Sequence, residues 1–591
     1  MIFYVYKRMK KLFSFVLLFI FIFTLSSCGE NKEIKILYTN DIHGYIANEK
    51  TDDNKNTIPS LRLNNIAAYR KKLIEDNYNV LLFDAGDEVQ GSVYGAIDKG
   101  TEMIKIMNKV GYDLAVPGNH DFDFGMDGFN KFVEEAKFPY LSCNFKSIEN
   151  NKNVLDSHKI FNVGGKKIGV VGISTPETIT SSTPKYFQND NGEFIYTFDG
   201  LKNKTDLYES AQKAIDEIRN NVNYLIVVGH LGVGADAEKN GVRSIDVINN
   251  TKGIDAFIDG HSHTVVEKQI VKTKDNKDCI LTQTGCYLDG FGEMTITKDG
   301  IDTKLIKNLS EYKNEEVKIL EEALINSVHD KLGEKIAKLE NPLYITNPNN
   351  LNQRLVRARE TNLGDFTADS VYWYLNEEKD LDCDIALANG GGIRANILDE
   401  DVTYLTAKTV EPFGNQICLI KTKGINIKNA LEMGVQEVGQ WDYEWNSPAE
   451  SGGFMQVAGM KYEIDCDVKS NIKIDENEMF KSVDGEYRVK NIMVYNKQTK
   501  SYENLDLNKE YYVGGINYIL RNSGNGLIMF KDSENVVDFV GEDYMILAQF
   551  MASFKNSQNE AVINNSNSPL KNYENPSGAG RINILNLKDY A

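Results

Sequence analysis

Histidine is rare in this chain of 591 residues, which contains only seven, and the stretch from residue 342 to 587 has none. The seven cysteines include no C-x-x-C spacing, so the sequence indicates neither a cysteine zinc motif nor a disulfide framework. The chain has fewer basic than acidic residues, 66 Lys and Arg against 85 Asp and Glu, and its net charge is −19. Because binders of nucleic-acid polymers usually carry basic faces, this balance argues against such a polymer as the main partner. A small anionic substrate is compatible with it if metal ions concentrate positive charge at one site.

Long apolar runs are confined to the N-terminus, where residues 12–23 follow four basic side chains within residues 7–11. The run is short for a membrane span and is typical of a signal-peptide core. It ends in Leu25-Ser26-Ser27-Cys28-Gly29, which resembles a bacterial lipobox. We expect residues 1–27 to be a lipoprotein signal peptide and Cys28 to receive the lipid; the alternative is an ordinary signal peptide with an incidental cysteine. The mature protein is then expected outside the cytoplasm, lipid-anchored to the cell envelope.

The length of the chain favours two large domains, and its 41% hydrophobic and 26% charged residues are typical of a soluble globular protein. From residue 34 to about 260, six short apolar runs predict strands, at 34–38, 80–83, 114–116, 167–172, 224–228 and 255–258. Helical patterns at 61–74 and 101–110 lie between them, which indicates an α/β domain with layered sheets. A helical pattern at 312–332, ended by Gly333, predicts a linker helix; a helix belonging wholly to either domain is the alternative.

Five of the seven histidines directly follow predicted strands. The strings are Thr39-Asn40-Asp41-Ile42-His43-Gly44, Asp84-Ala85-Gly86-Asp87, Gly118-Asn119-His120-Asp121-Phe122-Asp123, Gly229-His230 and Gly260-His261-Ser262-His263. Imidazoles and carboxylates suit zinc, manganese and similar ions, and this collection is large enough for two ions. In this order the strings match the metallophosphoesterase pattern D-x-H, G-D, G-N-H-[DE], H, G-H-x-H.

The chain therefore resembles the 5′-nucleotidase and UDP-sugar hydrolase family over essentially everything after Cys28. The resemblance implies a four-layer α/β/β/α metallophosphoesterase domain at 34–308, a linker helix at 309–341 and a second α/β, substrate-binding domain at 342–587. It further implies two divalent metal ions: Asp41, His43 and His263 would bind one, Asn119, His230 and His261 the other, and Asp87 both. Such a pair, about 3.5 to 4 Å apart, clamps a phosphoryl group and lowers the pKa of a bound water from 15.7 toward roughly 7.

The resemblance also assigns roles beyond the metals. His120 and Asp123 would form a dyad in which the carboxylate orients the imidazole and the imidazole stabilises or protonates the reacting phosphate ester. Asp84 and Asp121 match no ligand position and are expected to be structural. In the second domain, positions that the family uses to hold phosphate, substrate and base are matched by Arg357, Asn389, Arg394, Phe413 and Tyr518.

One position departs from the family pattern. Where the family commonly has G-G-D-G after the second aromatic residue, with the acid gripping the ribose, this chain has Ser523-Gly524-Asn525-Gly526. The ribose contact at Asn525, and with it the preference among nucleotides, is therefore open. An alternative is that an extra residue before this turn moves Asn525 away from the sugar.

These observations predict a two-metal hydrolase that releases phosphate from nucleoside 5′-monophosphates by attack of metal-bound hydroxide on phosphorus. Two enzymatic alternatives share the metal strings, a 2′,3′-cyclic nucleotide 2′-phosphodiesterase with 3′-nucleotidase activity and a UDP-sugar hydrolase. A nucleotide-binding surface lipoprotein without catalysis is the non-enzymatic alternative, which the complete set of ligands and dyad residues disfavours.

Overall fold

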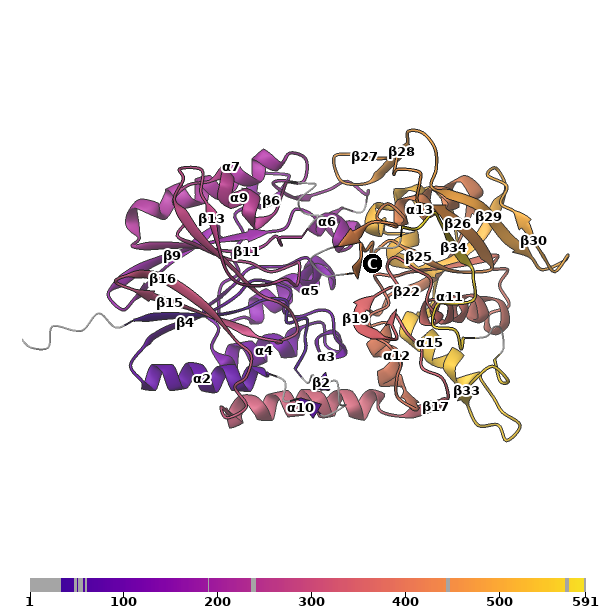
Figure 1. The fold of residues 1–591 in the computed structure, drawn as a ribbon, viewed down its shortest axis with the longest axis horizontal. Coiled ribbons are helices and arrows are strands. Elements are labelled where there is room, and N and C mark those ends of the chain that lie inside the picture. Colours follow the sequence, from indigo (N-terminus) through magenta and orange to yellow (C-terminus); the bar gives the residue numbers. More distant parts are fainter. Residues whose placement is uncertain are drawn as a thin grey trace, which may run out of the picture.

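The computed structural model describes residues 33–588 except 47–49, 52–56, 59–60, 190, 235–240, 443–446 and 569–572, so the predictions for the signal peptide and Cys28 lie outside the described residues. Figure 1 shows an N-terminal domain in indigo and magenta beside a C-terminal domain in orange and yellow, with helix α6 (Thr178–Ser181) at the boundary. Within the described ranges, no helix combines the length and the apolar character that a membrane span requires.

Two sheets form the centre of the N-terminal domain. The first has the order β16-β15-β1-β4-β5, built from Gly300–Ile306, Phe291–Thr297, Ile34–Thr39, Asn79–Asp84 and Leu114–Ala115. The second has the order β13-β14-β12-β11-β9-β8, built from Val265–Lys272, Asp278–Thr284, Ala256–Ile258, Tyr224–His230, Lys166–Ser174 and His158–Val163. All six strands predicted from apolar runs are confirmed. Strands β1, β4 and β5 are parallel, as are β9, β11 and β12.

The alternation of side chains along β1 explains the layers. Successive residues of a strand face opposite sides of its sheet, and accordingly Ile36 and Tyr38 lie in the core between the two sheets, whereas Leu37 packs against helices. Helices α2 (Leu63–Glu75) and α4 (Thr101–Val110) cover the first sheet, while α7 (Lys204–Ile218) and α9 (Ser244–Asn250) cover the second. The predicted α/β/β/α arrangement is confirmed.

The predicted linker helix is α10 (Glu315–Leu332). Asn314 caps its start by accepting hydrogen bonds from two backbone amides, and Gly333 follows its last residue. Its buried residues Val317, Leu324 and Val328 pack in the core that covers the first sheet, against α2 and α4. The helix also contacts α12 (Tyr404–Val410), so it lies along the N-terminal domain and reaches the C-terminal one.

The C-terminal domain is built around a sheet with the order β25-β20-β31-β22-β32, from Met455–Ala458, Ile385–Asn389, Glu510–Ile516, Gln416–Lys423 and Glu534–Glu542. Helices α11 (Asn362–Trp373) and α15 (Asp543–Ala552) pack on it in one continuous core. A hairpin of β27 (Ile472–Ile474) and β28 (Phe480–Val483) extends toward the N-terminal domain (Figure 1). Met479 of this hairpin is buried among side chains of the N-terminal core, so the hairpin ties the two domains together.

Candidate metal centre and active site

The ends of parallel strands bring the predicted metal residues to one edge of the N-terminal domain. Asp41 and His43 follow β1, Asp87 follows β4, His230 is the last residue of β11, and His261 follows β12. Parallel strands of one sheet share their carboxyl-terminal edge, and the two packed sheets bring both edges together. Segments separated by more than 200 residues in sequence therefore meet in space.

Buried carboxylates hold the turns that follow these strands. Asp84 Oδ1 accepts a hydrogen bond from the Gly86 amide at 2.8 Å. Asp121 Oδ2 accepts from the amides of Asp87, at 3.0 Å, and Gly118, at 2.8 Å. Both carboxylates bond to backbone amides, as expected of structural residues, and they fix the turn that presents the Asp87 side chain.

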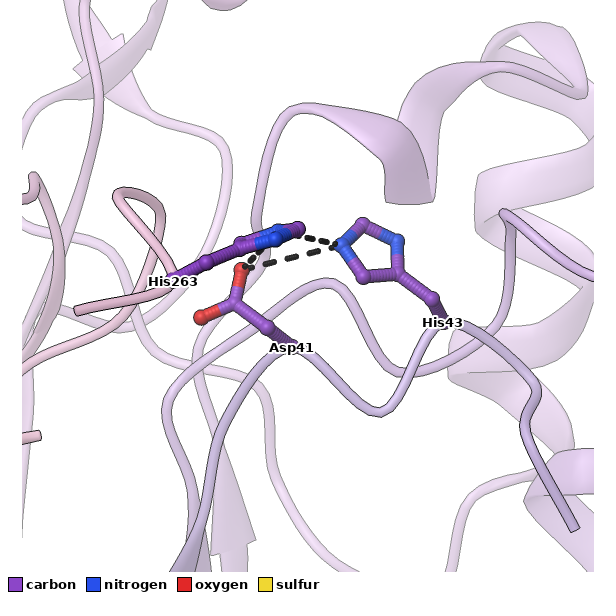
Figure 2. Close-up of side chains that lie close together, drawn as sticks. All are labelled: Asp41, His43 and His263. Carbon is purple, nitrogen blue, oxygen red and sulfur yellow. Dashed lines mark hydrogen bonds and ion pairs between the residues drawn. The ribbon is translucent and has the colours of Figure 1, made fainter. Parts of the chain in front are cut away.

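Asp41, His43 and His263 form the first cluster of potential metal ligands, which Figure 2 shows pointing toward one another. The two Nε2 atoms of the histidines are 2.9 Å apart. Asp41 Oδ1 lies 3.4 Å from His263 Nε2 and 3.7 Å from His43 Nε2. Three donor atoms thus converge on one point, as a single cation requires.

Asp87, His230 and His261 form the second cluster. Asp87 Oδ2 lies 3.1 Å from His230 Nε2 and 3.8 Å from His43 Nε2 in the first cluster. One carboxylate oxygen therefore faces both groups of ligands, which is the placement that a shared ligand needs.

The hydrogen bonds of the histidines fix which ring nitrogen can bind a metal. The Nδ1–H of His43 donates to the Gln90 carbonyl and that of His230 to the Ala85 carbonyl, each at 2.7 Å, so their Nε2 atoms face the site. Asn119 Oδ1 is buried and accepts no hydrogen bond from the described residues, while His230 Nε2 lies beside Asp87 Oδ2. Because buried polar atoms are normally satisfied, the orphaned oxygen of Asn119 fits a divalent cation.

Charge and burial shift the pKa values of these imidazoles in opposite directions. Burial lowers the pKa of His43 to about 3, against the attraction of Asp87. Burial also acts to lower the pKa of His230, but the charge of Asp87 outweighs it and raises the value to about 10. A divalent cation at the second cluster therefore competes with a proton that Asp87 holds on His230.

The predicted dyad is assembled. His120 Nδ1–H donates to Asp123 Oδ2 at 2.7 Å, and Asp123 Oδ1 accepts from Ser182 Oγ at 2.9 Å. The His120 amide donates to Asp87 Oδ1 at 2.8 Å, which links the dyad to the metal centre. Burial opposes the imidazolium, but Asp123 and Asp87 outweigh it and raise the pKa of His120.

The C-terminal domain faces this centre with aromatic and cationic side chains. The Phe413 ring stacks on the His120 ring across the domain boundary, with centroids 5.9 Å apart and planes at 27°. The Arg394 guanidinium lies 5.8 Å from the Phe413 centroid. The Nε of Arg357 is buried and has no hydrogen-bond partner among the described residues, and burial together with the charges of Arg354 and Arg394 lowers the pKa of Arg357. Such a concentration of guanidinium groups favours a phosphate ligand.

The other predicted substrate residues lie in the same domain. Asn389, at the end of β20, donates from Nδ2 to the Gly452 carbonyl at 3.1 Å, and its buried Oδ1 accepts from no group in the part of the chain that the structure describes. The backbone N–H of Asn525 donates to Tyr518 Oη at 3.2 Å, and its buried Nδ2 has no partner within the described ranges. Asn525 therefore lies beside the second predicted aromatic residue.

Several residues at the site were not predicted. Arg354 makes a bidentate ion pair with Glu450, with Nε 3.0 and 2.9 Å from its two oxygens, and Glu450 also lies 3.7 Å from Arg357. The Tyr287 ring lies 5.5 Å from the His43 ring. Glu177 Oε2 lies 3.3 Å from His261 Nε2. Of these residues, only Arg354 had a signal in the sequence, because it lies three residues before the predicted Arg357.

This fold and this pair of ligand clusters define a two-metal phosphoesterase. Residues 34–265 match the calcineurin-like phosphoesterase family, and residues 335–532 match the 5′-nucleotidase C-terminal domain. The chain therefore belongs to the 5′-nucleotidase family of metal-dependent phosphoric ester hydrolases, which use two divalent metal ions. The non-enzymatic alternative is set aside.

Two curated proteins and one crystal structure are similar to this chain over most of its length. The trifunctional nucleotide phosphoesterase protein YfkN of Bacillus subtilis is 29% identical over 75% of this chain, which spans only 30% of that longer protein. The 5′-nucleotidase of Mus musculus is 26% identical, with 88% of each chain covered. The crystal structure of a 5′-nucleotidase precursor from Thermus thermophilus superimposes with a TM-score of 0.71 at 25% identity, covering 94% of this chain and 99% of that one.

The fold alone does not define the substrate. The sulfate thiohydrolase SoxB of Thermus thermophilus has a TM-score of 0.63 with this chain, covers 95% of it and is 15% identical. The substrate must therefore be argued from the site.

Proposed function

We propose that this hydrolase releases phosphate from nucleoside 5′-monophosphates. The observation that carries the proposal is the Phe413 ring stacked on His120, because it puts an aromatic surface of the C-terminal domain directly beside the reacting centre. A nucleotide needs both parts, a flat surface for its base and a cationic centre for its phosphate. Base stacking on an aromatic ring contributes about 1 to 3 kcal/mol.

We assign the following roles to the residues of the site. Asp41, His43 and His263 would hold one ion, Asn119, His230 and His261 the other, and Asp87 both. When bound, the two ions would polarise the phosphoryl group and lower the pKa of a water molecule. His120, oriented by Asp123, donates a hydrogen bond or a proton to the phosphate ester.

The substrate-binding roles are divided between charge and stacking. Arg357 and Arg394 bind the phosphate through paired N–H donors, and Asn389 accepts or donates one further hydrogen bond to the substrate. Phe413 and Tyr518 enclose the base, and Asn525 contacts the ribose.

A comparison of substrates on the purified protein tests the proposal. With manganese present, kcat/KM should be highest for AMP among AMP, 3′-AMP, 2′,3′-cyclic AMP and UDP-glucose. Phe413→Ala should raise KM for AMP about tenfold, since the stacking of one base is lost. Phe539→Ala is the matched control, because Phe539 is a phenylalanine of the same domain and the residue is 55% exposed. A preference for one of the other three substrates would overturn the assignment.

A 2′,3′-cyclic nucleotide 2′-phosphodiesterase with 3′-nucleotidase activity is the second candidate. The trifunctional nucleotide phosphoesterase of Bacillus subtilis, whose name indicates more than one phosphoester substrate, supports it. UDP-sugar hydrolysis is the third outcome of the same substrate comparison.

We further propose that the protein lies outside the cytoplasm on a lipid anchor at Cys28, on the basis of the lipobox-like string that follows the apolar run. Cys28→Ala should move the protein from the membrane fraction to the soluble fraction of fractionated cells. Unchanged membrane association of that variant would contradict the anchor.

A further inference from the structure

The short segment formed by residues 177–182 contacts the metal centre, the dyad and the C-terminal domain at once. It consists of Glu177, the four residues of α6 and Ser182. Figure 1 places α6 at the boundary between the domains. None of its residues belongs to the ligand strings or to the dyad.

Glu177 controls which nitrogen of His261 is free. The carboxylate can only accept, so at 3.3 Å it takes the hydrogen bond from the Nε2–H of His261, and the lone pair is left on Nδ1. His43 and His230 have the opposite arrangement, in which Nδ1–H donates to a backbone carbonyl and Nε2 faces the site. Unlike His43 and His230, His261 is thus oriented by a side chain.

Ser182, at the other end of the segment, supports the dyad. Its Oγ donates to Asp123 Oδ1 at 2.9 Å, while Asp123 Oδ2 accepts from His120 at 2.7 Å. The hydroxyl thereby fixes the carboxylate plane that orients the imidazole.

Thr180, in the middle of the segment, is held by the C-terminal domain. Its carbonyl accepts a hydrogen bond from Tyr518 Oη at 3.2 Å, and its Oγ1 donates to Glu478 Oε2 at 2.7 Å. Helix α6 also packs against the turn η5 (Gly524–Gly526), which carries Asn525. The residues proposed to hold base and ribose therefore contact the same six-residue segment as the metal centre.

We propose that residues 177–182 form a positioning segment, in which Glu177 orients His261 for the second metal ion and Ser182 orients Asp123 for catalysis. The contacts of Thr180 make both orientations depend on the docking of the C-terminal domain. The role of Glu177 rests on the metal centre alone, whereas the role of Ser182 rests on the dyad of the proposed function.

Manganese titration of the chelator-treated full chain tests the role of Glu177 without substrate. Side chains that orient a metal-binding histidine typically contribute 10- to 100-fold in metal affinity. Glu177→Ala should therefore weaken the second Mn²⁺ binding event 10- to 100-fold and leave the first unchanged. Glu177→Gln should lose less, because its amide oxygen still accepts. Glu209→Ala, a change at an exposed glutamate of α7, is the control. Two unaltered binding events in both Glu177 variants would overturn this role.

A simple aryl phosphate tests the role of Ser182 independently of any nucleotide preference. With p-nitrophenyl phosphate, Ser182→Ala should lower kcat severalfold while KM and both Mn²⁺ affinities stay unchanged, since only the dyad is disturbed. Unchanged kcat would overturn the role, and a fall in metal affinity would show a structural effect instead.

Tyr518→Phe tests the dependence on the C-terminal domain, because it removes the hydroxyl that donates to Thr180 but keeps the ring. In the absence of nucleotide, the second Mn²⁺ affinity should fall about threefold or more. An affinity equal to that of the unmodified protein would contradict the coupling. A wrong nucleotide assignment would alter only the substrate comparison, so the two failures are distinguishable.

Discussion

Backbone conformation at single residues determines where the metal side chains point. Five of the seven proposed ligands have a positive φ without being glycine: Asp41 (51°), His43 (52°), Asp87 (60°), His261 (82°) and His263 (58°). Such conformations cost on the order of 1 to 3 kcal/mol each and persist where surrounding contacts impose them. Here the amide of Asp41 donates to the Gly86 carbonyl at 2.9 Å, and that of His43 to the Asp87 carbonyl at 2.7 Å. The turns after β1 and β4 thus hold each other in the strained form.

Asp87→Asn separates the charge of this residue from its backbone conformation, because asparagine adopts the left-handed region readily. The variant should fold normally but bind less metal, since a neutral amide replaces the carboxylate that faces both clusters. We expect kcat/KM on p-nitrophenyl phosphate to fall by orders of magnitude, with elemental analysis reporting the metal content. Asp380→Asn is the matched control, because Asp380 is exposed and has a φ of 52°. Full metal content with near-normal activity would contradict a shared ligand.

Asn525→Asp should sharpen the preference for ribose. Hydrogen bonds to charged groups contribute about 1.5 to 3 kcal/mol, against 0.5 to 1.5 for neutral ones. The unmodified protein should therefore discriminate weakly between AMP and 2′-deoxy-AMP, and the variant should discriminate severalfold better in kcat/KM. Asn559→Asp is the control, because Asn559 is exposed and has the same left-handed backbone. Strong selectivity for AMP over 2′-deoxy-AMP in the unmodified protein, or unchanged selectivity in Asn525→Asp, would show that another residue recognises the ribose.

The strands and helices of the N-terminal domain were predictable because local patterns encode them. Apolar runs such as Ile34–Thr39 and Tyr224–His230 are buried along nearly their whole length, so each stands out in the sequence. The histidine strings follow these runs directly. The contact of Glu177 with His261 joins residues 84 positions apart, and that of Arg354 with Glu450 joins residues 96 positions apart. Such pairs depend on how elements pack, which no local pattern records.

The two sheets of the N-terminal domain pack so closely that Gly292 of β15 leaves no space for a side chain, which predicts a loss of stability on substitution. Gly292 pairs with Tyr38 of β1, and a Cβ there would lie 1.9 Å from the Tyr38 ring. Tyr38 is fully buried, and its hydroxyl is 2.7 Å from Thr282 Oγ1 in the second sheet, so the ring cannot move away cheaply. Gly292→Ala should lower the free energy of unfolding by about 1 to 3 kcal/mol.

Urea unfolding with fluorescence detection measures this difference. Gly290→Ala is the matched control, since a Cβ at Gly290 would meet its nearest atom, the Ile306 carbonyl oxygen, at 3.4 Å. An equal urea midpoint for both variants would mean that the two sheets accommodate the extra methyl group without loss of stability.

Charge is distributed unevenly over the whole molecule. The chain carries a net charge of −19, yet Arg354, Arg357 and Arg394 influence one another electrostatically at the metal-facing side of the C-terminal domain, with Glu450 as a nearby carboxylate. Local cationic charge facing the metal centre therefore outweighs the acidic average where an anionic substrate would bind.

The contact between the domains should respond to pH through Glu478 of the β27–β28 hairpin. Burial and the charge of Glu177 raise the pKa of Glu478 from 4.5 to about 7, against the hydrogen bond from Thr180. Because the raised pKa belongs to the docked form, docking is favoured while Glu478 is protonated. This contribution is complete below pH 4.5 and is lost as the pH rises through about 7.

Small-angle X-ray scattering at pH 5 and pH 8 measures this opening. We expect a larger radius of gyration at pH 8 for the unmodified protein and no pH response for Glu478→Gln, since its neutral amide keeps the docked form at both values. Glu476→Gln is the matched control, because Glu476 lies in the same hairpin with 67% of its side chain exposed, 3.9 Å from Lys202. Equal radii at both pH values, or a response that survives in Glu478→Gln, would show that this carboxyl group does not govern domain docking.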